Sequence, residues 1–164
     1  MRYRYELGGD IGPVEPLLVA DRVVKIILWI MLNPSTADAM RDDPTIRTIV
    51  KFSELWGYNR LLVGNLYAYR ATRPSELFKA MGAGTFITGP ANNRSLTEMV
   101  DRVRKTGGRV MAAWGAKGRP DRVRQVHAIA GEMWCLTTNN DGSPVHPLYQ
   151  PHDLTPTVWQ GMPR

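Results

Sequence analysis

The longest apolar run of the chain covers residues 23–32 and contains one charged side chain, Lys25. Its β-branched composition is typical of a strand that is buried on both faces of a parallel sheet. The run ends abruptly in a polar stretch, residues 33–38 (Asn-Pro-Ser-Thr-Ala-Asp). Open α/β sheets bind their ligands beyond the carboxyl ends of the strands. The hydrophobic pattern therefore predicts a central strand that is followed directly by a ligand-binding loop.

Three later apolar segments also predict strands. They cover residues 60–67, 109–114 and 132–138. At the N-terminus, two extended segments (3–7 and 16–20) flank a glycine-rich stretch (8–13), and we expect them to form a hairpin at the sheet edge. The segment from residue 139 onward is rich in proline and is expected to be mostly loop.

Four segments between the predicted strands are expected to be helices. Asp43 caps the first, which ends at Gly57, and the others cover residues 75–81, 92–105 and 120–130. Strands that alternate with helices imply parallel βαβ units. We therefore predict a single α/β domain over residues 1–164. Its architecture is a three-layer α/β/α sandwich with a mainly parallel four-stranded central sheet, plus the N-terminal hairpin.

Composition narrows the class of protein. The apolar fraction of 43% and the charged fraction of 22% are ordinary for a soluble globular domain. No segment reaches the roughly 18 uninterrupted apolar residues of a membrane span, and residues 1–5 lack the apolar stretch of a signal peptide. A single cysteine, Cys135, permits no internal disulfide and no multi-thiolate metal cluster. We expect a cytoplasmic, monomeric protein without a metal or cofactor.

Charge is distributed unevenly along the chain. Nine basic and three acidic residues lie between Arg94 and Arg124, and this stretch accounts for the whole net charge of +6. A basic region on a neutral body favours a polyanionic partner such as nucleic acid or a nucleotide. The alternative is that these charges lie on the solvated faces of two helices.

Several polar residues lie at or just after the ends of the predicted strands, which share one edge in a parallel sheet. Asn33 is either a turn former or an amide that orients a water or binds a carbonyl. Asn65 interrupts an apolar strand, so its amide needs partners there. Either a base edge or the backbone of a neighbouring loop supplies them.

Two other segments at this edge carry candidate chemistry. Residues 114–118 (Trp-Gly-Ala-Lys-Gly) join a strand to a helix and leave room for an anion at the helix start, although they lack the P-loop pattern. His146 either donates to a developing anion or is an ordinary exposed histidine. The sequence contains no nucleophile elbow and no clear Ser-His-Asp set.

Charged residues after the first two predicted strands leave alternatives open. Asp43 is interpreted as a helix cap, whereas Asp38 and Asp42 are available for chemistry. A metal would need two or three of these carboxylates to converge, which spacing alone does not establish. Arg70 and Arg73 either hold phosphate or are simply exposed.

The order of these motifs resembles the uracil-DNA glycosylase superfamily. Residues 31–35 (Met-Leu-Asn-Pro-Ser) are similar to the Gly-Ile-Asn-Pro-Gly motif of its mismatch-specific members. Residues 62–66, followed by Arg70, look like the strand whose Asn reads an extruded base. Residues 113–115 (Ala-Trp-Gly) resemble the Leu-Trp-Gly strand end, and residues 146–147 resemble the start of the His-Pro-Ser-Pro-Leu loop.

A more direct resemblance covers nearly the whole chain. Segments 33–38, 42–45, 56–58, 70–72 and 146–149 are similar to the bacterial and phage family 1643 of domains of unknown function. This second resemblance implies no activity.

The glycosylase resemblance implies a uracil-DNA glycosylase-like fold and a role for each matching residue. Asn33 would position the attacking water, Asn65 would read the flipped base, and His146 would stabilise the departing base. Asp38 is a further candidate catalytic residue. The remaining candidates contact the substrate (Pro34, Ser35, Arg70, Tyr149, with Leu148 or Tyr149 as the wedge) or the DNA backbone (Arg73, Lys117, Arg119, Arg122).

These expectations define one main function and two alternatives. The main one is metal-free hydrolysis of the N-glycosidic bond of an unusual, modified or mismatched base, flipped out of double- or single-stranded DNA. One alternative is a hydrolase or transferase that acts on a free or modified nucleotide, with Asp38 and Asp42 taking part. The other is a catalytically inactive DNA-binding module of the same fold.

Overall fold

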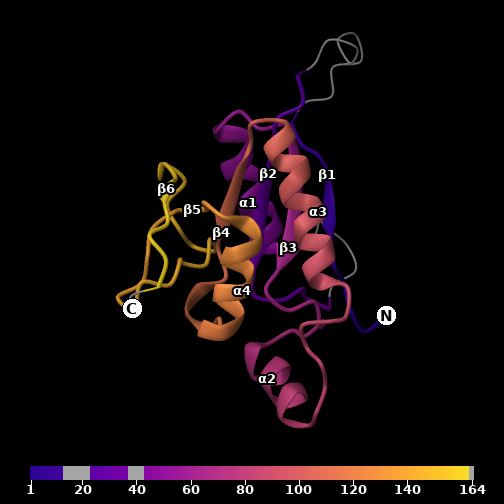
Figure 1. Ribbon diagram of the computed structural model, residues 1–164. Helices are drawn as coiled ribbons and strands as arrows, with labels where there is room; N and C mark the ends of the chain where they lie inside the picture. Colours follow the sequence, from indigo (N-terminus) through magenta and orange to yellow (C-terminus); the bar gives the residue numbers. More distant parts are fainter. Residues whose placement is uncertain (13–22, 37–42, 163–164) are drawn as a thin grey trace.

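A six-stranded mixed sheet forms the centre of the computed structural model, which describes residues 1–12, 23–36 and 43–162 (Figure 1). The strands are β1 (Leu7–Asp10), β2 (Ile26–Met31), β3 (Arg60–Asn65), β4 (Arg109–Ala112), β5 (Trp134–Cys135) and β6 (Thr157–Val158). They lie in the order β1-β3-β2-β4-β5-β6. The four central strands are parallel, and β1 and β6 pair antiparallel at the two edges. The predicted α/β class and parallel four-stranded core are confirmed.

Helices occupy the connections between the strands. They are α1 (Pro44–Leu55), α2 (Pro74–Gly82), α3 (Asn92–Lys105) and α4 (Pro120–Ala130), with a short 3-10 turn, η1 (Gly115–Lys117). α1 begins as predicted because the Asp43 carboxylate accepts a hydrogen bond from the Thr45 N–H (2.8 Å), and Pro44 needs no partner in the first turn. The helix ends at Leu55, two residues before Gly57, whose φ of 82° favours glycine. α3 and α4 have the bounds that the sequence predicts.

Side chains of β2 alternate between two hydrophobic layers. Leu28 and Ile30 pack in the layer under α3 and α4, whereas Trp29 and Met31 pack in the layer next to α1. No β2 residue is more than 6% exposed, so the strand is buried on both faces. Figure 1 shows α3 and α4 in front of the sheet and α1 behind it. The result is an α/β/α arrangement, with α2 lying beyond the lower end of the sheet.

The N-terminal turn predicted at residues 8–13 is wrong where the structure describes it. Residues 7–10 form β1, which pairs with β3 from Leu7↔Val63 to Asp10↔Arg60. β1 approaches β3 closely at Gly8, where a Cβ would lie 2.6 Å from the Leu61 carbonyl oxygen. A glycine therefore suits this position in the strand. The second half of the expected hairpin, residues 16–20, lies outside the described residues.

The C-terminal segment also differs from its prediction as loop. β5 covers two residues instead of seven, and β6 pairs with it through Trp134↔Val158 and Cys135↔Thr157. Trp159 anchors the segment, since the residue is 5% exposed and its indole Nε1 donates to the Gly142 carbonyl (2.9 Å). Among the helices that the structure describes, none has the length and apolarity needed to cross a membrane.

Candidate functional site

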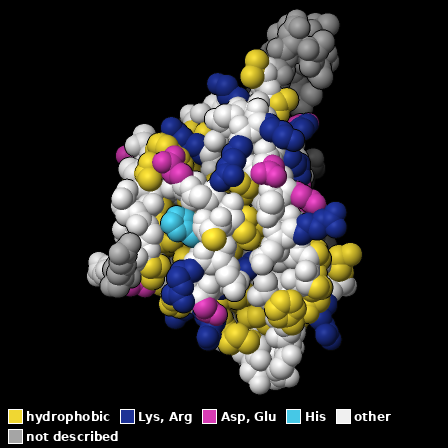
Figure 2. All heavy atoms as spheres, in the orientation of Figure 1, with side chains coloured by type: hydrophobic (Ala, Val, Ile, Leu, Met, Phe, Trp, Pro, Cys, Tyr) yellow, Lys and Arg dark blue, Asp and Glu magenta, His cyan; other side chains and the backbone are white. Residues whose placement is uncertain are grey.

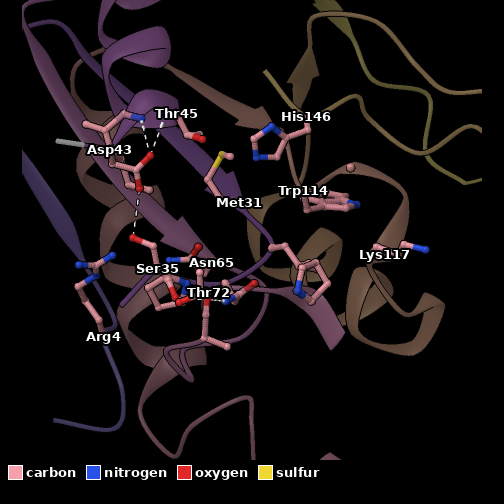
Figure 3. Close-up of a pocket in the computed structure, with 18 of the residues that line it drawn as sticks. Arg4, Met31, Ser35, Asp43, Thr45, Asn65, Thr72, Trp114, Lys117 and His146 are labelled. Atoms are coloured by element: carbon pink, nitrogen blue, oxygen red, sulfur yellow. Dashed lines mark hydrogen bonds between the residues drawn. The ribbon is translucent and has the colours of Figure 1, made fainter. Parts of the chain in front are cut away.

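The carboxyl ends of β2 and β3 and the segment after β4 border a cavity of about 370 Å³ (Figure 3). Small-molecule sites occupy roughly 300–1,000 Å³, so this cavity has the size of a ligand site. It is lined by Arg4, Leu7, residues 31–35, Asp43, Thr45, Ile46, Val63, Asn65, Ala71, Thr72, Pro74, residues 114–117 and His146. The cavity therefore lies where an open α/β sheet places its ligands.

Three residues expected at this edge come together in the cavity: Asn33, Asn65 and His146. The parallel pairing of β2 with β3 sets Met31 opposite Asn65, two residues before Asn33. The segment that follows β5 brings in His146 from the other side (Figure 3). Pro34, Ser35 and Lys117, also candidates from the sequence, line the same cavity.

Asn33 both shapes the loop and leaves one polar atom for a ligand. Its Nδ2 donates to the Ala71 carbonyl at 2.8 Å and to the Pro34 carbonyl at 3.1 Å. These bonds hold the loop after β2 against the segment after β3. No described residue donates to Asn33 Oδ1, so this oxygen can accept a hydrogen bond from a water or a ligand.

Among the residues that line the cavity, Asn65 gives the clearest indication of a ligand. Its side chain is buried, with the residue 5% exposed, and no hydrogen bond joins its carboxamide to any described residue. The two polar atoms of this amide are not sealed off from solvent, because they face the open cavity. Because the side chain lines the cavity, a ligand can supply the missing donor and acceptor.

The backbone beneath Asn65 is held by two buried side chains from α3 and α4. Asn92 Nδ2 donates to the carbonyls of Asn65 (3.0 Å) and Leu66 (3.1 Å), and Arg122 Nε also donates to Leu66 (2.6 Å). Arg122 is 3% exposed, so the prediction that it contacts the DNA backbone is wrong. Its guanidinium instead binds a carbonyl that the sheet leaves without a strand partner.

Asp43 has a position that the sequence did not predict. It caps α1, as expected, but it also lines the cavity. Its Oδ1 accepts from the Thr45 N–H, and its Oδ2 accepts from Ser35 Oγ at 3.1 Å. The sequence pattern identified Asp43 as a helix cap. Its place in the cavity follows from the position of the start of α1 beside the sheet edge that holds Asn33.

His146 presents a defined face to the cavity. The Leu148 N–H donates to His146 Nδ1 (3.2 Å), so the proton of the neutral imidazole lies on Nε2. The residue is exposed, as one of the two sequence-based alternatives holds, but its imidazole is partly desolvated at the cavity wall. This partial desolvation lowers the pKa of His146, and the Asp43 carboxylate opposes the effect by raising it. The net shift is downward from an ordinary pKa of 6.5, which favours the neutral form at neutral pH.

Other predicted cations lie outside the cavity lining. Arg70 Nη2 donates to the Thr36 carbonyl (2.8 Å) at the edge of the site. Arg73 is exposed at the start of α2, and Arg119 is exposed and pairs with Asp121 at 3.4 Å. Lys117 is the one predicted backbone contact that borders the cavity.

Two further candidates complete the set. Tyr149 is 93% exposed, lies outside the lining and has a φ of 66°. Asp38 lies outside the described residues, as does Asp42.

Three polar lining residues were not among the candidates from the sequence: Arg4, Thr45 and Thr72. The segment with Arg4 reaches the site because its backbone N–H donates to the Ala68 carbonyl (2.9 Å) after β3. In the described part of the chain, no group of three or more His, Cys, Asp or Glu side chains is arranged to hold a metal ion.

The chain matches a known protein family. No curated protein and no solved structure matches the chain, so none of the comparisons supports the resemblance to uracil-DNA glycosylases. The family described as "Protein of unknown function (DUF1643)" matches residues 18–148. Because this match covers most of the 164 residues, the chain belongs to the DUF1643 family.

Proposed function

We propose that this protein hydrolyses the N-glycosidic bond of an unusual, modified or mismatched base in DNA, on a uracil-DNA glycosylase-like fold. The observation that carries the proposal is the convergence of Asn33, Asn65 and His146 on one cavity. Residues 114–115, the remaining motif of the resemblance, border it too. Four short motifs, spread over more than a hundred residues, thus meet in the way that a shared site requires.

The open polar atoms of the cavity suit a flipped nucleobase. The Asn65 carboxamide offers one donor and one acceptor side by side, which matches the edge of a base. His146 Nε2–H can donate to the charge that develops on the base as its bond to the sugar breaks. Asn33 Oδ1 can orient the water that replaces the base.

Tyr149 supports a duplex substrate. A base that leaves the stack makes a gap, which exposed apolar or aromatic side chains can fill. Tyr149 lies three residues after His146 and is 93% exposed. A positive φ is uncommon for a residue other than glycine, and such strain is concentrated at functional sites.

Base release tests the proposal directly. Duplexes with a single uracil, mismatched thymine or alkylated base are incubated with the wild-type protein and with three variants: Asn33→Ala, Asn65→Ala and Asn140→Ala. Asn140 is exposed and lies outside the cavity, so Asn140→Ala is the matched control. We expect release by the wild type and the control, and a loss of about 100-fold or more in the first two variants. Unchanged release in both, or no release by the wild type, contradicts the proposal.

One observation favours a free or modified nucleotide as the substrate instead. Two cations, Arg4 and Lys117, line the cavity, and such side chains bind phosphate. Turnover of nucleotides but not of DNA, or dependence on added Mg²⁺, would select this alternative. DNA binding without release of any base would select the inactive binding module.

A further inference from the structure

One charged group of the cavity has so far only a structural role. The carboxylate of Asp43 lies on the wall formed by the start of α1, above Ser35 and on the opposite side of Met31 from His146 in Figure 3. Its Oδ1 is held by the first turn of the helix through the N–H groups of Thr45 (2.8 Å) and Ile46 (3.4 Å). The carboxylate is thus fixed in place before any ligand enters.

A second contact ties this carboxylate to the loop after β2. Ser35 Oγ donates to Asp43 Oδ2 at 3.1 Å, and Ser35 is two residues after Asn33. A carboxylate has about four acceptor positions, and the described residues use three of them. One position therefore remains for a water or a ligand in the cavity.

The electrostatic setting agrees with this geometry. Asp43 and His146 line the same cavity. The Asp43 carboxylate raises the pKa of His146 against the larger effect of partial desolvation. Across a cavity that contains a reacting sugar, they occupy complementary positions: an acceptor for a proton and a donor to the departing base.

We propose that Asp43 is the catalytic carboxylate of this site and removes a proton from the attacking water. The inference rests on the proposed hydrolysis of a glycosidic bond. The water oxygen bonds to the sugar C1′, and the C1′–N bond breaks, with its electron pair leaving on the base. Asp43 takes one water proton and returns it to solvent, and the base takes one proton from solvent. The products are a free base and a sugar with a C1′ hydroxyl group.

The negative charge of Asp43 serves a second purpose in the same step. Cleavage of a glycosidic bond passes through an oxocarbenium-like state with positive charge on the sugar. A fixed carboxylate stabilises that charge, and Asn33 Oδ1 remains to orient the water.

Capping and catalysis separate cleanly at this position, since Asn caps helices about as well as Asp but carries no charge. If Asp43 only caps α1, Asp43→Asn should keep full base release. If it acts in the reaction, the same variant should keep its melting temperature and lose about 100-fold or more in release. Asp101→Asn, which removes an exposed carboxylate of α3 outside the cavity, is the matched control and should keep both.

An NMR titration gives a readout that needs no activity. Because the Asp43 carboxylate raises the pKa of His146, Asp43→Asn should lower that pKa further, whereas Asp101→Asn should leave it unchanged. An unshifted His146 pKa overturns the inference, since the two groups would then not face each other.

Base release that is lost in Asn33→Ala but kept in Asp43→Asn overturns it as well, while the proposed function stands. A wild-type protein that releases no base overturns the proposed function, and the catalytic role of Asp43 with it.

Discussion

Two buried asparagines, Asn65 at the end of β3 and Asn92 at the start of α3, differ in what their amides do. Asn92 Nδ2 donates to two backbone carbonyls, whereas no described residue bonds to the Asn65 carboxamide. We therefore expect Asn92→Ala to lower the free energy of unfolding by about 2–3 kcal/mol, and Asn65→Ala to change it by no more than about 1 kcal/mol. Urea denaturation measures both. Equal losses would mean that the Asn65 amide already has a partner in the folded protein.

Arg122 stabilises the folded protein and contributes little to its surface charge. Its Nε donates to Leu66, and its Nη1 donates to Asn93 Oδ1 (2.6 Å) and Gln125 Oε1 (2.9 Å). Arg122→Ala removes three charge-assisted hydrogen bonds and the packing of a side chain that is 3% exposed, so we expect a loss of about 3 kcal/mol in unfolding free energy. Arg124→Ala, on the exposed side of the same helix, should change it by about 0.5 kcal/mol or less. Thermal unfolding that affects both equally would contradict this assignment.

At the residue scale, sequence patterns predict the hydrogen bonds that a residue makes within its own turn of chain. They predict less well where the folded protein places that residue. The capping role of Asp43 follows from its neighbours Pro44 and Thr45, because a cap involves one turn of chain. The presence of Asp43 in the cavity depends on how α1 packs against the sheet. The burial of Arg122 depends on a carbonyl at the end of β3, which no local pattern around residue 122 reveals.

At the scale of elements, the helices follow closely from the sequence and the sheet edges do not. Apolar spacing defines α3 and α4 because each packs one stripe on the sheet. β1 and β6 are short and depend on partners far away in sequence, β3 and β5. Their own residues, two glycines in β1 and a proline-rich segment around β6, resemble loop, and long-range pairing overrides that preference.

The packing of α3 on β3 provides a test at this scale. A Cβ on Gly64 would lie 2.7 Å from Leu96 Cδ2 and 2.9 Å from Met99 Cε, both on α3. Gly64→Ala should therefore force the ends of these two buried side chains into other rotamers and cost about 1 kcal/mol of unfolding free energy. Gly82→Ala, at the end of α2 with nothing within 4 Å of a new Cβ, should gain up to about 1 kcal/mol. A stable Gly64→Ala protein would show that the α3 side chains rearrange freely, contrary to close packing.

At the scale of the whole molecule, the basic surplus is partly neutralised where it lies. On α3, Arg94 pairs with Glu98 at 2.9 Å, and Arg102 pairs with Glu6 at 2.6 Å. Figure 2 shows Lys and Arg side chains interspersed with Asp and Glu on this face. The excess charge of the stretch from 94 to 124 thus does not form one uninterrupted basic surface on this face. For the DNA substrate that we propose, cations near the cavity are the ones expected to meet the phosphates around the site.

Salt dependence of DNA binding tests which surface meets the phosphates. Each phosphate contact contributes about one unit to the slope of log affinity against log salt. We expect Lys117→Ala and Arg73→Ala each to lower that slope by about one, because Lys117 lines the cavity and Arg73 precedes α2 next to it. Arg94→Ala, on α3 and already paired with Glu98, should leave the slope unchanged. Fluorescence anisotropy with labelled duplexes over a range of salt gives these slopes. If Arg94→Ala lowers the slope as much as Lys117→Ala does, the DNA lies across α3, and a base flipped from it would not reach Asn65.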